Sequence, residues 1–132
     1  MVEYIVEDDG DMYTEKDGKY HSYDDKPALI RPDGRRFWYK DGYLHRDNDL
    51  PAIVDKNGGQ YWYKKSRRHR DNDMPAIIYP NGDQYWYQNG KLHRDNNLPA
   101  AIYADGGAEW WINNKLVKQC DDYFVRVKRA NC

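Results

Sequence analysis

The tripeptide His-Arg-Asp is the pattern in this chain that comes nearest to known catalytic chemistry, and it occurs three times, beginning at His45, His69 and His93. A protein kinase uses this tripeptide once, in a far longer chain that also carries a glycine-rich phosphate loop. Three copies at a constant spacing indicate a structural role instead. We expect the histidine to stack beside a cross-strand tryptophan, the arginine to lie over an aromatic ring, and the aspartate to close a linker by Asx-turn hydrogen bonds. The sequence therefore predicts a non-enzyme without catalytic residues.

Two kinds of metal site can be weighed against this structural interpretation. The histidines recur at His21, His45, His69 and His93. Rungs of an antiparallel ladder two strands apart lie about 10 Å from each other, so they cannot share a zinc ion whose ligands sit about 2.1 Å away. The Asp-Asn-Asp linkers 47–49 and 71–73 offer oxygen ligands for calcium, but they lack the loop length and final glutamate of an EF-hand. We expect turn chemistry there, with no metal and no cofactor.

One basic cluster interrupts the otherwise mixed charge pattern, and it consists of Lys64, Lys65, Arg67, Arg68 and Arg70. At its centre Lys65-Ser66 replaces the Asn-Gly or Asp-Gly pair that neighbouring segments carry at the same position, a local departure from turn chemistry. Such a cluster can serve as a nuclear-import signal or a phosphate-binding patch. The alternative is a solvated turn that carries its charges by chance.

These residues belong to a repeat of 24 residues that runs through most of the chain without insertion or deletion. The positions that recur are the four histidines above, the tryptophans Trp38, Trp62, Trp86 and Trp110, and the prolines Pro27, Pro51, Pro75 and Pro99. A fixed period of this length is typical of repeat proteins, in which each unit buries its apolar face only by stacking on its neighbours.

Within one repeat, β-prone segments alternate with turn signals. Residues 76–79 and 84–87 read as strands, and they are separated by a Pro-Asn-Gly-Asp turn. The Asn89-Gly90 pair then predicts a second tight turn. If both turns hold two residues, Ile77 faces Trp86 and Trp86 faces His93, whereas Ile78 faces Tyr85 and Tyr87 faces Leu92. No window has a helical period, so the fold class is all-β.

The repeats predict an elongated, single-layer, twisted antiparallel sheet of β-hairpins. We expect hairpins near residues 2–16, 28–40, 52–64, 76–88 and 100–112, and one closing strand at 124–127. Residues 1–132 form a single repeat domain, divided into a half-unit 1–12, units 13–36, 37–60, 61–84 and 85–108, and a degenerate C-terminal cap 109–132.

Composition and charge limit the function classes. The apolar content comes largely from 13 Tyr and 5 Trp, and the net charge of −1 gives no general attraction to nucleic acid or acidic lipid. The start of the chain resembles no signal peptide, and no stretch approaches the roughly 18 apolar residues of a membrane span. We therefore expect a soluble, intracellular protein. Cys120 and Cys132 lie outside the repeated positions, which favours two reduced thiols over a single bridge.

The segment YPNGDQYWYQNGKLH, residues 79–93, resembles the MORN repeat, whose pattern is Y-x-x-G-x-x-Y-x-G-x-W-x-x-G-K-x-H-G. A Tyr-Trp-Tyr triplet replaces the Y-x-G-x-W pair, H-R-D-N-x-x-P-A replaces H-G-x-G, and the period is 24 instead of 23. This variant is similar to the MORN-like repeat proteins of large DNA viruses, the giant viruses. The resemblance covers essentially the whole chain, and it implies single-layer hairpin ribbons that act in scaffolding, dimerisation and protein contacts, without shared chemistry.

We interpret the chain as a non-catalytic MORN-like scaffold for protein–protein interaction, a viral protein acting in the host cytoplasm or nucleus. The expected contact surface is an aromatic ladder of Trp38, Trp62, Trp86, Trp110, Tyr39, Tyr63 and Tyr87. The sequence does not identify the protein partner, and it is compatible with both a weak homodimer and a monomer. The alternative function is a nuclear-targeted or nucleic-acid-binding module that uses the basic turn 64–70.

Overall fold

The computed structural model describes residues 2–123, which form nineteen β-strands and no helix. The predicted all-β class is therefore confirmed. The strands are β1 (Ile5–Val6), β2 (Met12–Tyr13), β3 (Glu15–Lys16), β4 (Lys19–Tyr20), β5 (Leu29–Ile30), β6 (Arg36–Phe37), β7 (Tyr39–Lys40), β8 (Tyr43–Leu44), β9 (Ile53–Val54), β10 (Gln60–Tyr61), β11 (Tyr63–Lys64), β12 (Arg67–Arg68), β13 (Ile77–Ile78), β14 (Gln84–Tyr85), β15 (Tyr87–Gln88), β16 (Lys91–Leu92), β17 (Ala101–Ile102), β18 (Ala108–Ile112) and β19 (Lys115–Cys120).

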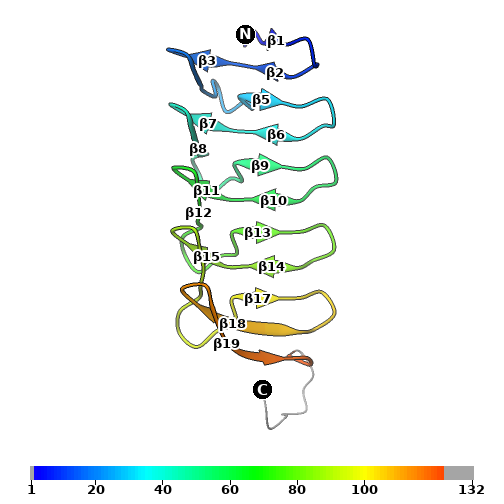
Figure 1. Cartoon of the computed structure of the whole chain (residues 1–132), viewed down its shortest axis with the longest axis vertical. Helices are drawn as coiled ribbons and strands as arrows, with labels where there is room; N and C mark the ends of the chain where they lie inside the picture. The colour runs from blue at the N-terminus through cyan, green and yellow to red at the C-terminus, as the bar shows by residue number, and fades with distance from the viewer. Residues whose placement is uncertain (1, 124–132) are drawn as a thin grey trace. The chain divides into compact units, whose positions relative to one another are not determined.

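The chain divides into two compact parts, Met1–Arg67 and Arg68–Cys132. In the N-terminal part, antiparallel strands follow the order β1-β2-β5-β6-β9-β10, and in the C-terminal part the order is β13-β14-β17-β18-β19. Four narrow hairpins, β3-β4, β7-β8, β11-β12 and β15-β16, stand beside these ladders. In each part the hairpins follow one another in chain order. The turns within the ladder hairpins β1-β2, β5-β6, β9-β10, β13-β14 and β17-β18, here called the wide turns, lie at the opposite end of the strands from the narrow hairpins (Figure 1).

The wide turns hold three residues instead of the expected two. At Tyr79–Asp83, the Tyr79 N–H donates to the Asp83 carbonyl at 3.0 Å, and the Gly82 N–H donates to the Tyr79 carbonyl at 2.9 Å. Gly82 has φ of 100°, which is accessible without strain only to glycine. The extra residue shifts the register, so Ile77 faces Tyr85 and Ile78 faces Gln84. The prediction that Ile77 faces Trp86 and Ile78 faces Tyr85 is therefore wrong by one residue.

The narrow turns do hold two residues. Asn89 and Gly90 both have positive φ, 51° and 83°, as a type I′ hairpin requires. Tyr87 faces Leu92, which confirms this half of the expected register. Lys65 and Ser66 adopt the same conformation, with φ of 49° and 66°, although neither side chain favours it.

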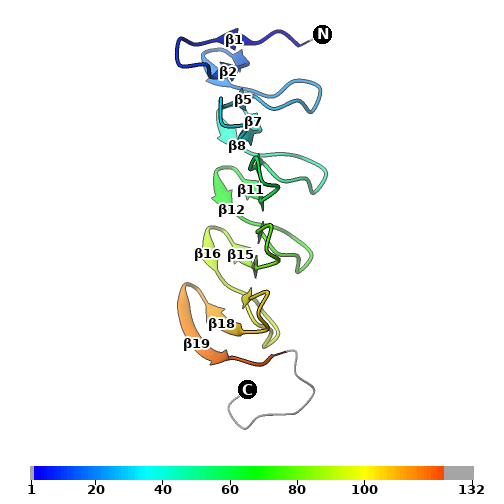
Figure 2. The ribbon, with the colours of Figure 1, turned by 90° about the vertical axis from the view of Figure 1, so that its right-hand side faces the viewer.

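The chain bends at Trp38, Trp62 and Trp86, and this bend separates the main ladder from the narrow hairpins; Thr14 holds the equivalent place in the first hairpin, and β18 runs on through Trp110. β6 ends at Phe37 and β7 begins at Tyr39, so Trp38 occupies the corner between them. After the bend the narrow hairpins turn to one side, and the linkers that lead to the next repeat loop out on the other (Figure 2). The buried residues of the repeats meet at this corner: Trp38, Trp62, Trp86 and Trp110, with Ala28, Ala52, Ala76 and Ala100.

The last hairpin differs from the others, since β19 continues straight where earlier repeats turn into a linker. β19 pairs with β18 from Ile112↔Lys115 to Ala108↔Cys120. In the three preceding repeats the His-Arg-Asp tripeptide starts the linker, whereas the matching residues here are Val117, Lys118 and Gln119. β19 thus takes the place beside β18 that β17 takes beside β14, the counterpart of β18 in the preceding repeat. This strand was not predicted, and the expected closing strand at 124–127 lies outside the described residues.

Candidate functional site

The most elaborate arrangement of polar side chains is the joint between repeats, built around each tryptophan. Trp38 is 5% exposed, and its indole N–H donates to the Asp25 carbonyl at 3.0 Å. The linker before Trp38 therefore wraps the edge of its ring. Trp86 makes the same bond to the Asp73 carbonyl, and Trp110 makes it to the Asn97 carbonyl. These linker residues have positive φ, which suits Asn and Asp better than most residues.

The arginine of the tripeptide covers the other side of this joint. The Arg46 guanidinium lies over the Trp38 ring, with Cζ 3.9 Å from the centroid. It donates to both carboxylate oxygens of Asp25, at 2.9 and 3.1 Å, and to the Pro51 carbonyl at 3.2 Å. Arg94 repeats the arrangement in the C-terminal part: its Cζ lies 4.0 Å from the Trp86 centroid, and it binds Asp73 and the Pro99 carbonyl. The predicted contact between arginine and an aromatic ring is confirmed.

Hydrogen bonds from Arg46 lower the pKa of the Asp25 carboxyl group below its ordinary value. The same pairing requires a planar donor with two parallel N–H groups, which arginine supplies and lysine does not. The Arg–Asp pair joins residues 21 positions apart, so it ties the linker of one repeat to that of the next.

Three of the four histidine rings also link neighbouring repeats, and they do so by hydrogen bonds. The His45 N–H donates to the Trp38 carbonyl at 3.1 Å, and its ring Nε2 lies 2.8 Å from Asp47 Oδ1. In His21, His69 and His93, ring Nδ1 accepts a backbone N–H from Asp41, Asn89 and Asn113, respectively. Nδ1 therefore carries no proton in these three rings, and in His69 and His93 Nε2 is the donor to aspartate.

The aspartate of the tripeptide binds its own histidine instead of closing the linker. The Asp47 carboxylate is hydrogen-bonded to the His45 ring, and this bond lowers the pKa of the Asp47 carboxyl group. Lys40 Nζ lies 3.7 Å from Oδ2 of the same carboxylate. The linkers close by backbone bonds, such as Leu98 N–H to the Asp95 carbonyl at 3.4 Å. The expected Asx turns are therefore replaced by backbone turns, because the carboxylate has a stronger partner nearby.

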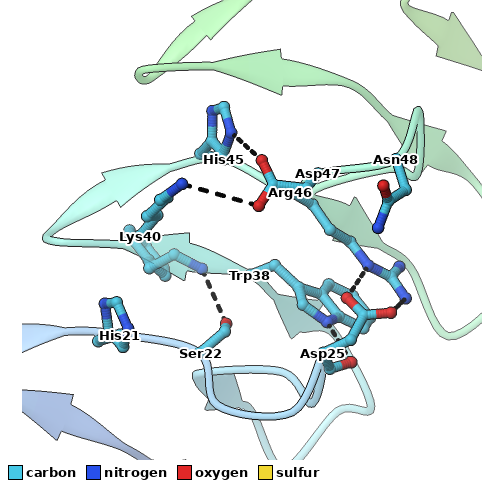
Figure 3. Close-up of a pocket in the computed structure, with 10 residues that line it drawn as sticks. His21, Ser22, Asp25, Trp38, Lys40, His45, Arg46, Asp47 and Asn48 are labelled. Atoms are coloured by element: carbon cyan, nitrogen blue, oxygen red, sulfur yellow. Dashed lines mark hydrogen bonds and ion pairs between the residues drawn. The ribbon is translucent and has the colours of Figure 1, made fainter.

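An open hollow of about 250 Å³ lies at this joint in the N-terminal part (Figure 3). Its wall combines His21, Ser22, Asp25, Trp38, Tyr39, Lys40, His45, Arg46, Asp47 and Asn48. A similar hollow of about 190 Å³ in the C-terminal part includes Trp86, His93, Arg94 and Asp95. In Figure 3 the charged groups point at one another, with Arg46 on Asp25 and His45 and Lys40 on Asp47. Because these charged side chains bind one another, the arrangement stabilises the contact between repeats.

The residues predicted as an aromatic contact surface fall into two groups. Trp38, Trp62, Trp86 and Trp110 are 5–7% exposed and belong to the core, which differs from the expected open row. The sequence could not reveal this because the rings are covered by linker backbone and arginine. Tyr39, Tyr63 and Tyr87 are half-buried and keep part of their surface at the solvent. Tyr20 and Tyr43, which the sequence did not single out, are more exposed, at 38% and 54%.

The predicted basic patch is divided. Lys64, Lys65 and Arg67 are exposed on the narrow hairpin at the end of the N-terminal part. Arg68 and Arg70 begin the C-terminal part, where the Arg68 guanidinium lies 5.5 Å from the Tyr87 ring centroid and Arg70 donates to the Pro75 carbonyl at 3.1 Å. Arg70 thus makes the same bond to a linker proline carbonyl as Arg46 and Arg94 make.

Two side chains that contribute to the contacts between repeats are hard to recognise from the sequence. Ser66 Oγ accepts the Leu44 N–H at 3.0 Å, and Asn114 Oδ1 accepts the Leu92 N–H at 2.8 Å. Both side chains occupy the second turn position, where other repeats have glycine. The acidic partners Asp25 and Asp73 could have been found from their constant spacing of 21 residues to the arginines.

Residues 2–123 contain no group of three or more His, Cys, Asp or Glu side chains placed to hold a metal ion.

Cys120 is 3% exposed, packs with Ala108 and Trp110, and is disulfide-bonded. The expectation of a reduced thiol is therefore wrong for Cys120, since it rested on the place of the cysteines outside the repeated positions, which does not decide whether a bridge forms. Cys132 lies outside the described residues.

No helix in the described part of the chain is long and apolar enough to cross a membrane. Comparisons of the chain with protein-family models, with curated proteins and with solved structures gave no match.

Proposed function

We propose that this protein is a non-catalytic, MORN-like repeat scaffold that binds another protein. The observation that carries the proposal is the joint at Trp38, where Arg46 is engaged with the Trp38 ring and Asp25, and Asp47 is engaged with His45. The polar residues that recur with the repeat hold adjacent repeats together. What distinguishes one repeat from the next is displayed on the exposed surface, as in other repeat proteins that use their length for binding.

The half-buried tyrosines that recur with the repeat, here called the tyrosine row after their order in the sequence, are the residues we propose for contact with the partner. Tyr39 and Tyr63 belong to the N-terminal part, and Tyr87 holds the equivalent position in the C-terminal part. Tyrosine supplies a large contact area at low entropic cost and keeps a polar end for the solvent, which explains its enrichment at interfaces. Self-association into a weak homodimer is one form that this contact can take. A viral origin and a place in the host cytoplasm or nucleus belong to the same proposal, and rest on the resemblance to MORN-like repeats.

Affinity capture with the purified full chain tests the proposal. A protein that binds through the row is retained by the wild type and lost with Tyr39→Ser combined with Tyr87→Ser. The control is Met74→Ser, a substitution of an exposed linker residue outside the row. Circular dichroism must show that all variants stay folded. Retention of the same proteins by every variant would remove the row from the proposal, and light scattering across protein concentrations decides whether a second copy is the partner.

A further inference from the structure

The narrow hairpin at the end of the N-terminal part carries a dense positive charge. Lys64, Lys65 and Arg67, here called the basic hairpin, are all exposed, and no acidic residue lies between Tyr61 and Arg70. The first turn residue of the other narrow hairpins is acidic or neutral, Asp17, Asp41 or Asn89, whereas the basic hairpin has Lys65 there. The basic hairpin thus departs from the charge pattern of the other repeats.

The basic hairpin also departs from the repeat in its backbone. Lys65 and Ser66 hold positive φ of 49° and 66°, where the equivalent turns have Asp41-Gly42 and Asn89-Gly90. Neither Lys nor Ser adopts this conformation readily. Strained backbone positions of this kind are concentrated at functional sites, where the surface chemistry outweighs the loss of stability.

A third departure lies beneath the same turn. His45 Nδ1 is buried without a hydrogen-bond partner, whereas the equivalent atoms of His21, His69 and His93 accept a backbone N–H from the residue 20 positions later. For His45 that residue is Lys65. The turn therefore weakens the repeat both by strain and by a missing hydrogen bond.

An exposed tyrosine lies on the strand that the basic hairpin contacts. The Ser66 N–H donates to the Leu44 carbonyl at 2.9 Å, and Ser66 Oγ accepts the Leu44 N–H at 3.0 Å. These bonds bring the turn against β8, whose other residue, Tyr43, is 54% exposed. The acidic run Glu7 to Asp11 lies in a wide turn, at the opposite end of the strands from the narrow hairpins (Figure 1). Positive charge and an open ring are therefore combined at one end of this part.

We propose that the basic hairpin and Tyr43 form a binding site for single-stranded nucleic acid. The three cations would contact successive phosphates, and the Tyr43 ring would stack on an unpaired base. Cationic side chains beside exposed aromatic rings are the usual means by which proteins bind single strands without sequence preference. An acidic polypeptide would use the same cations, but it offers no base for the Tyr43 ring. The ring therefore favours the nucleic acid over the acidic peptide.

Fluorescence anisotropy with the full chain and a labelled single-stranded oligothymidylate of about 20 nucleotides tests this site. Three phosphate contacts on a single strand predict a slope of about −2 for the logarithm of affinity against the logarithm of salt concentration. Affinity should then fall about 18-fold between about 50 and 200 mM salt. Absence of salt-dependent binding would overturn the proposal.

A pair of matched variants separates the basic hairpin from general charge. Lys65→Asn with Arg67→Gln removes two positive charges from the site, and Lys65→Asn introduces the residue that the Asn89 turn already carries. Lys91→Gln with Lys115→Gln removes two charges from narrow hairpins of the C-terminal part, at the positions equivalent to Arg67. The first pair should bring the salt slope from about −2 to about −0.7, and the second pair should leave it at about −2. Equal effects of the two pairs would contradict a local site.

The ring is tested separately. Tyr43→Ser should weaken binding of the oligonucleotide by about 5-fold or more and leave the salt slope unchanged, because a stacking contact is lost and the cations remain. Polyglutamate of similar length serves as competitor. If it displaces the oligonucleotide at equal concentration and Tyr43→Ser has no effect, the basic hairpin binds acidic polypeptide and the proposal fails.

Discussion

The guanidinium of Arg46 lies over the Trp38 ring, 3.9 Å from its centroid, and this contact joins one repeat to the next. The same guanidinium binds the Asp25 carboxylate, which belongs to the linker before Trp38, and the Pro51 carbonyl in the linker after it. A single side chain therefore fixes two linkers and one core ring. The arginine of the His-Arg-Asp tripeptide, which suggests catalysis in the sequence, therefore holds adjacent repeats together.

Arg46→Lys should lower the free energy of unfolding by about 1–2 kcal/mol. Lysine keeps the positive charge but loses the two parallel bonds to Asp25 and much of the contact over the ring. Urea denaturation followed by circular dichroism measures the effect.

The matched control is Arg35→Lys. Arg35 also pairs with a carboxylate, Asp33 at 2.8 Å, but both side chains are nearly half exposed. The loss there should stay below about 0.5 kcal/mol, as for other exposed ion pairs. Equal losses at Arg35 and Arg46 would show that the joint adds nothing beyond a surface pair.

Trp86→Ala should destabilise the protein by about 3 kcal/mol or more, because the ring is 5% exposed and its removal leaves a cavity. Trp86→Phe should recover part of this loss, but it leaves the Asp73 carbonyl without its indole donor. Circular dichroism is the appropriate signal, since the substitution changes the fluorescence.

Trp111 provides the comparison for Trp86 within the same part of the chain. It is only half-buried, and its indole N–H binds the Glu109 side chain at 3.0 Å. Trp111→Ala should cost less than Trp86→Ala. A larger loss at Trp111 would contradict the assignment of the repeated tryptophans to the core.

Sequence reasoning captured the parts of this fold that depend on local chemistry. The Asn89-Gly90 pair defined a type I′ turn and with it the pairing of Tyr87 with Leu92. The wide turn at Pro80-Asn81-Gly82 misled, because the same Asn-Gly pair there supplies only one residue of positive φ, Gly82. The Asp83 N–H binds Asn81 Oδ1, which stabilises the longer loop. A dipeptide alone does not distinguish these two turns.

The candidate site was harder to predict than the strands, since it depends on contacts across repeats. That arginine lies over a ring follows from composition and period, but burial of Trp38 depends on where the linker carbonyl of Asp25 falls. The end of the ladder illustrates the same limit. Replacement of the tripeptide by Val117, Lys118 and Gln119 removes the linker signal, and only the structure shows that β19 then pairs with β18.

Lys65→Asn should stabilise the protein by about 0.5 kcal/mol, because asparagine adopts positive φ more readily than lysine. Replacing the whole pair by Asn-Gly should give little further gain. Glycine relieves the strain at Ser66, but it also removes the hydroxyl that accepts the Leu44 N–H, and each effect is worth about 1 kcal/mol. Urea midpoints of the single and double variants measure the difference. A fall in stability with Lys65→Asn alone would show that lysine makes a contact that outweighs its strain.

Stability should decline on the acid side as the joint loses its carboxylates. The pKa of Asp25 is lowered from 3.8 chiefly by its hydrogen bonds to Arg46, and that of Asp47 is lowered chiefly by its bond to His45. A carboxyl group with a lowered pKa in the folded state contributes stability above its unfolded value, and this contribution is lost as the pH falls through the folded pKa. The loss of these two carboxylates should therefore decrease the urea midpoint from about pH 4 downward. Asp25→Asn should lower the midpoint at neutral pH and flatten the decrease below pH 4, since the neutral amide has no charge to lose. An acid limb as steep in Asp25→Asn as in the wild type would mean that the pair with Arg46 does not contribute to the acid sensitivity of the fold.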